Sequence, residues 1–256
     1  MGKPEILNNI MCILTNFLKI KVNFGKNYEN DRQLFRGLCN QCLTLKGIDE
    51  KFYKLQDELL SLEREEKGIV DISQFEYKDN IALWQGDITT LQADAIVNAA
   101  NDQYLGCFVP CHSCIDNIIM SASGFQMRDE LLKLKEQPDF ECQKVKVTKG
   151  YNLPCQYVFH VAGPEIFGEV SQKDRKDLRD CYRHCLDQAK AMKLSSIVFC
   201  CISTGLYSFP NDEACEIAVA TVKAWMQENQ FELKVVFNVY QDIDQELYAR
   251  ELHIKN

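Results

Sequence analysis

The stretch Ala95-Ile96-Val97-Asn98-Ala99-Ala100-Asn101 passes from a short apolar run into two amides separated by small residues. This pattern is typical of a buried strand that leads into a loop. Similar apolar runs occur at Ile81–Trp84, Lys144–Thr148, Tyr157–Val161, Ile197–Ile202 and Lys234–Val239. Segments with helical periodicity lie between these runs, near residues 114–135, 173–192, 211–228 and 242–251. Strands that alternate with helices predict an α/β fold with helices on the faces of a sheet.

The first 70 residues have a helical pattern throughout. Apolar residues recur there at steps of three and four, which predicts two amphipathic helices, at Leu34, Leu38, Cys42 and Leu45 and then at Phe52, Leu55, Leu59 and Leu62. Asp49 is placed to cap the second helix and Gly68 to end it. We therefore expect a helical extension over residues 1–70, packed on a core domain over residues 71–256.

Composition restricts the partners and the compartment. The net charge is −8 and no Lys/Arg cluster is visible, so the sequence predicts neither a nucleic-acid partner nor a membrane surface. The early apolar run at residues 10–18 is too short to span a bilayer and lacks the basic flank of an export signal. The cysteines number 13, which is odd and argues against a disulfide framework. We expect a cytoplasmic protein with free thiols.

Three loops that follow predicted strands have side chains suited to a phosphate-bearing ligand. Gly86-Asp87-Ile88-Thr89 offers a tight turn and a carboxylate, although a helix-capping role for Asp87 is equally compatible with the pattern. Asn98 and Asn101 both donate and accept hydrogen bonds, which suits sugar hydroxyls. The run from Ser203 to Pro210 precedes a predicted helix and combines hydroxyls with a glycine. Successive N–H groups in such a loop can hold an anion without side-chain charge.

A possible metal site follows the asparagines. Gly106-Cys107-Phe108-Val109-Pro110-Cys111-His112-Ser113-Cys114-Ile115-Asp116-Asn117 places three thiols and an imidazole within eight positions. Zinc favours thiolate and imidazole ligands. Three ligands would leave a coordination position open for catalysis, whereas a fourth from Cys111 would close a structural site. The sequence alone leaves both arrangements open.

The order of these motifs, with Tyr157-Val158-Phe159-His160-Val161-Ala162-Gly163-Pro164 between them, resembles that of macrodomains, which bind ADP-ribose. The resemblance covers residues 75–250 and implies a three-layer α/β/α fold with a central mixed sheet. The cysteine-rich loop stands where most macrodomains have a glycine-rich stretch. In this respect, and in its helical extension, the chain resembles the zinc-dependent macrodomain hydrolases associated with class M sirtuins.

The resemblance assigns roles to particular residues. Asp87 would accept a hydrogen bond from the adenine amino group, with the backbone of Ile88 alongside. Asn98 and Asn101 would orient the distal ribose. Zn²⁺ would be held by Cys107, His112 and Cys114, with Asp116 a partner of His112 or a helix-turn carboxylate. Met120 stands where many macrodomains have a histidine. The diphosphate would be wrapped by Ser203, Thr204, Gly205, Leu206 and Tyr207, with Phe209 packed near the distal end.

The implied function is hydrolysis of the glycosidic or ester bond that joins mono-ADP-ribose to a protein side chain, with a preference for acidic side chains. The resemblance also implies a lipoyl-carrier protein as the modified substrate. Three alternatives stay open. One is a non-catalytic reader of ADP-ribose with a structural zinc. The second is an O-acetyl-ADP-ribose deacetylase, and the third is a scaffold that holds a partner through the N-terminal helices.

Overall fold

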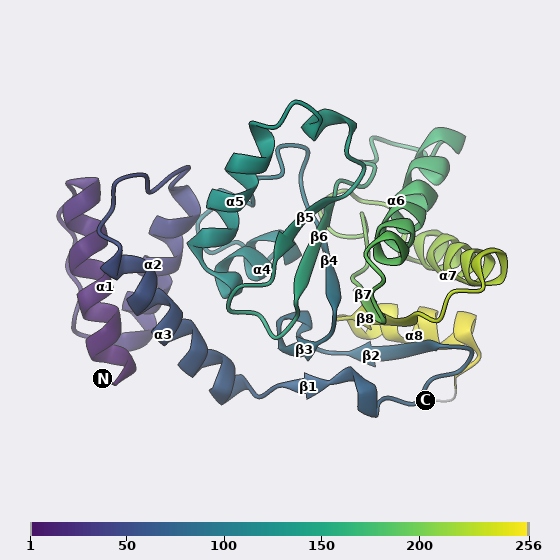
Figure 1. Ribbon diagram of the computed structural model, residues 1–256, viewed down its shortest axis with the longest axis horizontal. Coiled ribbons are helices and arrows are strands. Elements are labelled where there is room, and N and C mark those ends of the chain that lie inside the picture. The colour runs from purple at the N-terminus through teal and green to yellow at the C-terminus, as the bar shows by residue number, and fades with distance from the viewer. Residues whose placement is uncertain (1, 255–256) are drawn as a thin grey trace.

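The computed structural model describes residues 2–254 and has one six-stranded mixed sheet at its centre (Figure 1). The strand order is β2-β8-β7-β4-β6-β5, and every neighbouring pair is parallel except β5 and β6. The sheet strands are β2 (Ile81–Gln85), β4 (Ala95–Ala99), β5 (Lys146–Lys149), β6 (Tyr157–Val161), β7 (Ser196–Phe199) and β8 (Lys234–Val239). A separate two-stranded parallel pair joins β1 (Val70–Asp71) to β3 (Leu91–Gln92). The expected mixed sheet is confirmed.

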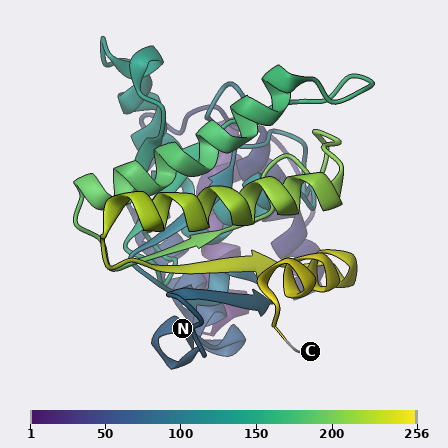
Figure 2. The ribbon, with the colours of Figure 1, turned by 90° about the vertical axis from the view of Figure 1, so that its right-hand side faces the viewer.

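Helices cover both faces of the sheet, which gives the expected three layers (Figures 1 and 2). On one side lie α4 (Ile115–Ser123) and α5 (Phe125–Lys135), and on the other lie α6 (Gln172–Ala191), α7 (Asn211–Asn229) and α8 (Asp242–Leu252). Short 3-10 turns occur at η1 (Ile72–Gln74), η2 (Ile88–Thr90) and η3 (Phe140–Cys142). The central strands read as continuous apolar runs because they are buried on both faces. The largest fully buried side chains of this core are Trp225, Tyr182, Phe159, Phe199, Phe209 and Phe237.

The helix expected near residues 114–135 is two helices, divided at Gly124. This glycine has a φ of +99°, which side-chain-bearing residues rarely adopt. A Cβ at this position would lie 2.7 Å from polar atoms of both Gln56 and Gln126. The break therefore allows α5 to approach the N-terminal extension closely.

The extension contains three helices, α1 (Lys3–Leu18), α2 (Tyr28–Gln41) and α3 (Lys51–Lys67). They enclose a second apolar core, and Phe125 of α5 completes it from the sheet domain. The two expected amphipathic helices are present as α2 and α3, but α2 ends before Cys42, whose backbone is extended. The Asp49 carboxylate accepts the Lys51 N–H, and Gly68 ends α3 with a φ of +81°. Within residues 2–254, no helix is both long and apolar enough to cross a membrane.

Candidate functional site

The predicted ligand loops meet at one edge of the sheet. β2, β4, β6 and β7 run in the same direction, so their carboxyl ends lie together. Asp87 follows β2, Asn98 lies near the end of β4 with Asn101 just beyond it, and Ser203 follows β7. Gly163, after β6, allows the loop after β7 to pack closely against it, because a Cβ at position 163 would lie 2.2 Å from the Ser203 hydroxyl. Open α/β sheets bind ligands at this edge.

Asn98 has a fixed orientation and an unused acceptor. Its Nδ2 donates to Oδ1 of Asp116 at 2.8 Å and to Nδ1 of His160 at 3.0 Å. Because Nδ1 of His160 accepts, its Nε2 carries the proton and donates to Thr148 at 2.9 Å. The Asn98 side chain is fully buried, yet its Oδ1 has no partner within the described part of the chain. A buried acceptor without a partner is costly, so a ligand hydroxyl at this point would satisfy it.

His160 is a buried, hydrogen-bonded histidine of the core. Burial lowers its pKa to about 3, so it is neutral near pH 7. The sequence does not by itself place His160 in the site, but the pairing of β4 with β6 places it directly beside Asn98. A histidine in an apolar strand was the available signal. Its neutral form supplies the acceptor that orients Asn98.

Asp116 joins the two asparagines. It is 4% exposed, and its Oδ2 accepts from Nδ2 of Asn101 at 3.4 Å. Burial raises its pKa to about 6, against the opposing effects of the Asn98 hydrogen bond and the charge of Arg128. Its hydrogen bonds go to these asparagines rather than to His112, which was one of the two roles expected from the sequence. Asp116 thus acts on the predicted ribose-binding amides.

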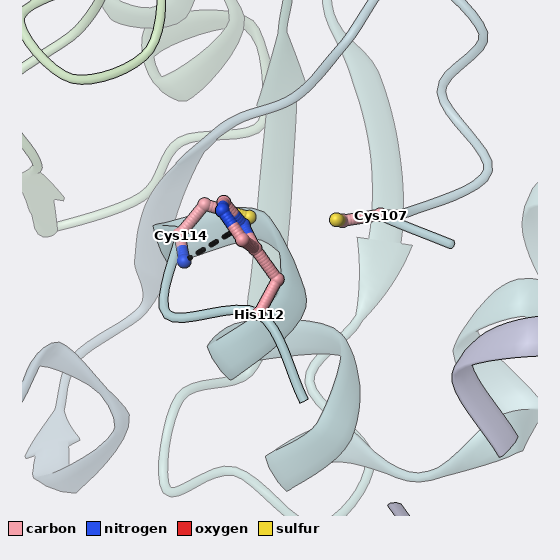
Figure 3. A group of neighbouring side chains, drawn as sticks. All are labelled: Cys107, His112 and Cys114. Atoms are coloured by element: carbon pink, nitrogen blue, oxygen red, sulfur yellow. Dashed lines mark hydrogen bonds between the residues drawn. The ribbon is translucent and has the colours of Figure 1, made fainter. Parts of the chain in front are cut away.

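The predicted zinc ligands lie together. Ligand atoms of Cys107, His112 and Cys114 are all within 4.8 Å of one another, and the Cys107 sulfur points toward the other two side chains (Figure 3). A tetrahedral zinc ion with bonds of about 2.0–2.3 Å holds its ligands roughly 3.5–3.8 Å apart. Adjustments of about 1 Å would therefore suffice, and the donor set suits zinc. Cys111 is turned away, because its Sγ donates to the Gln33 carbonyl at 3.1 Å.

Cys114 also starts helix α4. Its Sγ accepts the Asn117 N–H at 3.4 Å, so the thiol occupies the N-cap position. Burial and the neighbouring Cys107 raise the pKa of Cys114 to about 12, although the Asn117 hydrogen bond opposes this. Such a thiol gives up its proton only to a strong competitor such as a metal cation. The Nδ1 of His112 accepts the Cys114 N–H at 3.3 Å, a long bond that metal binding through Nδ1 would replace at little cost.

Two further residues shape the metal loop. Gly106 has a φ of +83°, and a Cβ there would lie 3.0 Å from Met120, which is a core residue under the loop. Arg128 is 3% exposed and donates to the Leu105 carbonyl at 2.8 Å and to the Cys39 carbonyl at 2.7 Å. Nothing in the local sequence of Arg128 indicates this role. It ties the start of the loop to the carboxyl end of α2.

The loop after β7 has the geometry of an anion site. Ser203 and Ser208 have φ values of +67° and +57°, and the loop is closed by the Phe209 N–H, which donates to the Ser203 carbonyl. Phe209 itself is buried in the core, 1% exposed, whereas Leu206 is exposed. Within residues 2–254, four successive N–H groups donate no protein hydrogen bond, those of Thr204, Gly205, Leu206 and Tyr207.

Ser203 and Tyr207 are the residues of this loop that lie next to the rest of the site. The Ser203 hydroxyl is buried and has no partner among the described residues. Burial and the charges of Asp102, Glu165 and Asp116 raise the pKa of Tyr207, and the Tyr207 carbonyl accepts the Ile166 N–H at 2.8 Å from the loop after β6. The predicted diphosphate and ribose regions are therefore adjacent.

Asp87 caps η2 and contacts the extension. Its Oδ1 accepts the backbone N–H of Thr89 at 2.9 Å, which agrees with the capping alternative, while Ile88 is buried within η2. Its Oδ2 accepts from Lys67, the last residue of α3, at 3.0 Å. Burial alone would raise the pKa of Asp87, but the Thr89 hydrogen bonds and the Lys67 charge outweigh burial and lower it. The carboxylate is therefore ionised and available as an acceptor at neutral pH.

Comparisons with known proteins agree with this geometry. The Macro domain model matches residues 97–218. A protein-ADP-ribose hydrolase of Staphylococcus aureus (strain MRSA252) is 44% identical over 227 residues, covering 87% of this chain and 85% of the relative. One of Treponema medium is 40% identical over 236 residues, covering 90% of each.

Solved structures also match. An Oceanobacillus iheyensis macrodomain with ADP has a TM-score of 0.60 and 31% identity, covering 67% of this chain and 88% of that one. A Trypanosoma brucei macrodomain in complex with ADP-ribose has a TM-score of 0.64 and 29% identity, covering 82% of this chain and 93% of that one. The chain belongs to the macrodomain family, in the group whose curated relatives are named protein-ADP-ribose hydrolases.

Proposed function

We propose that this protein is a zinc-dependent hydrolase that removes mono-ADP-ribose from acidic protein side chains. The observation that carries the proposal is the position of the Cys107, His112 and Cys114 group on the loop between Asn101 and helix α4. The carboxylate of Asp116, two residues beyond Cys114, bonds to both Asn98 and Asn101. A metal held by the three ligands would lie next to the ribose-binding amides.

The nucleotide would be held by Asp87 and by groups that the fold leaves without a hydrogen-bond partner. Asp87 would accept from the adenine amino group, and the free N–H groups of residues 204–207 would hold the diphosphate. The unpartnered Oδ1 of Asn98 would accept from a hydroxyl of the distal ribose. Such positioning supplies a large part of the barrier reduction in hydrolytic enzymes.

The metal group would act at the distal ribose. When bound by three protein ligands, zinc has an open position from which it can activate a water or polarise a substrate oxygen. Asn101 is held by Asp116 and donates also to the Gly106 carbonyl at 3.1 Å, so its amide bridges the ribose region and the metal loop. The side chain of Cys111 lies outside the group, which favours three ligands and a catalytic site.

The preference for acidic side chains rests on the family resemblance, as does a lipoyl-carrier protein modified by a class M sirtuin as the natural substrate. An ester linkage at an acidic residue has a better leaving group than a linkage at serine or arginine. Release from these three linkages therefore tests the preference directly.

The test is release of ADP-ribose from a protein that carries it on aspartate, compared with proteins that carry it on serine or arginine. Native protein, chelator-stripped protein and protein given zinc again are assayed side by side. We expect release from the aspartate linkage that disappears on stripping and returns with zinc. Tight ADP-ribose binding without release by the zinc-loaded protein would instead support a reader. Release that survives complete zinc removal would refute zinc dependence.

A further inference from the structure

We propose that Arg36, on helix α2 of the N-terminal extension, is a positioning residue for the metal loop, so that the extension is part of the metal centre. The inference rests on the proposed function, because it assumes that Cys107, His112 and Cys114 bind zinc. It goes further because it makes the zinc affinity of that site depend on a residue that precedes each of the three ligands by 71 or more positions in the chain. No ligand is changed in its test.

Arg36 holds the loop directly at one of the three ligands. Its Nη2 donates to the His112 carbonyl at 2.8 Å and to Oδ1 of Asn117 at 2.7 Å, and its Nε donates to the same Oδ1 at 3.1 Å. This is a forked contact of the kind for which a planar guanidinium is suited. None of the ion pairs within residues 2–254 involves Arg36, and its Nε also donates to the Ser121 hydroxyl on α4 at 3.2 Å.

Asn117, which is held by Arg36, forms hydrogen bonds to the two cysteine ligands and to the loop between them. It is fully buried, and its Nδ2 donates to the Val109 carbonyl at 2.9 Å and more weakly to the Cys107 carbonyl at 3.5 Å. Its backbone N–H donates to the Cys114 sulfur. Asn117, whose side chain Arg36 orients, therefore contacts both cysteine ligands: its side chain contacts the Cys107 carbonyl, and its backbone N–H contacts the Cys114 sulfur.

A second contact from α2 fixes the middle of the loop. The Asn40 side chain accepts the Cys111 N–H at 3.0 Å, and Cys111 donates its thiol to the Gln33 carbonyl. Cys111 has a φ of +52°, so this turn depends on outside contacts. A Cβ at Gly37 would lie 3.5 Å from Pro110, which is an ordinary van der Waals contact, so this face of α2 lies directly against the loop. Helix α2 thus lies against the loop from residue 110 to residue 112.

The orientation of metal ligands by surrounding hydrogen bonds contributes strongly to affinity, and loss of such a partner typically costs about 10- to 100-fold. We expect Arg36→Met to weaken zinc binding by a factor in this range. Arg36→Lys keeps the charge but loses the fork, so its affinity should be intermediate. The matched control is Arg64→Met, because Arg64 also joins the extension to the sheet domain, through the Asn152 carbonyl at 2.9 Å, but does not contact the loop.

Zinc affinity of the full-length proteins is measured by competition with a chromogenic chelator, and cobalt is titrated to follow the sulfur-to-cobalt charge-transfer band. We expect Arg36→Met to reach the same band intensity as wild type at a higher metal concentration, because both thiols are still ligands. Arg64→Met should bind zinc within about threefold of wild type. Thermal unfolding of the metal-free proteins shows whether each variant is folded, and Arg36→Lys provides the test if Arg36→Met is not.

Zinc affinity of folded Arg36→Met equal to that of wild type would overturn the inference, as would an equal loss in Arg64→Met. If wild type itself binds no zinc or cobalt, the proposed function fails instead, and the two failures are distinguished.

Discussion

We expect acid to lower the free energy of unfolding of this protein through His160, and a variant at this position separates its contribution from that of other groups. The imidazole is fully buried between Asn98 and Thr148, and burial lowers its pKa to about 3. In the unfolded chain a histidine titrates near pH 6.5. The unfolded state therefore binds a proton below that pH while the folded state does not. The stability that His160 contributes is complete above about pH 6.5 and is lost as the pH falls toward 3.

The size of the effect follows from the two pKa values. Between about pH 7.5 and pH 5, the unfolded state takes up nearly one proton at this position, which lowers the free energy of unfolding by about 2 kcal/mol. Asp116 contributes with the opposite sign, because its raised pKa favours proton uptake by the folded state in the same range. The wild-type change alone therefore mixes several groups, and a variant is needed.

The assay is urea unfolding of metal-free wild type and His160→Gln at the two pH values, followed by tryptophan fluorescence. Glutamine retains a donor and an acceptor but does not titrate. His160→Gln should be less stable than wild type at pH 7.5, and acidification should cost it about 2 kcal/mol less than it costs wild type. Equal losses in the two proteins, within about 0.5 kcal/mol, would refute the reasoning.

Three other outcomes are expected. Cys114→Ser should abolish zinc retention on dialysis without destabilising the metal-free protein, because serine is a good N-cap for α4. Gly163→Ala should lower stability by about 1–3 kcal/mol, since its Cβ would lie 2.2 Å from the Ser203 hydroxyl, whereas Gly205→Ala, with open space around it, should leave the melting temperature unchanged. Asp87→Ala should weaken ADP-ribose binding by about 10- to 100-fold in calorimetry and remove any preference over the hypoxanthine analogue, which lacks the amino group.

Local sequence patterns were sufficient to predict much of the fold and of the candidate site. The bounds predicted for the strands Tyr157–Val161 and Lys234–Val239 agree with the structure at both ends, because buried strands are apolar throughout and are bounded by polar turns. The helix break at Gly124 was missed, since the apolar periodicity continues across it and only the contact with the extension requires it. The three candidate metal ligands lie within eight positions, so chain connectivity alone brings them near one another.

The sequence by itself determined the alternation of strands and helices, the loops at the carboxyl ends of the strands and the donor types of the metal loop, because these depend on neighbouring residues. Only the tertiary structure decided which thiol turns away from that group, since Cys111 is directed by the Gln33 carbonyl of α2. It also decided that His160 orients Asn98 from 62 positions away and that Arg36 holds Asn117 from 81 positions away. Hydrogen bonds over such separations exist only after the elements have packed, and no local pattern in the chain encodes them.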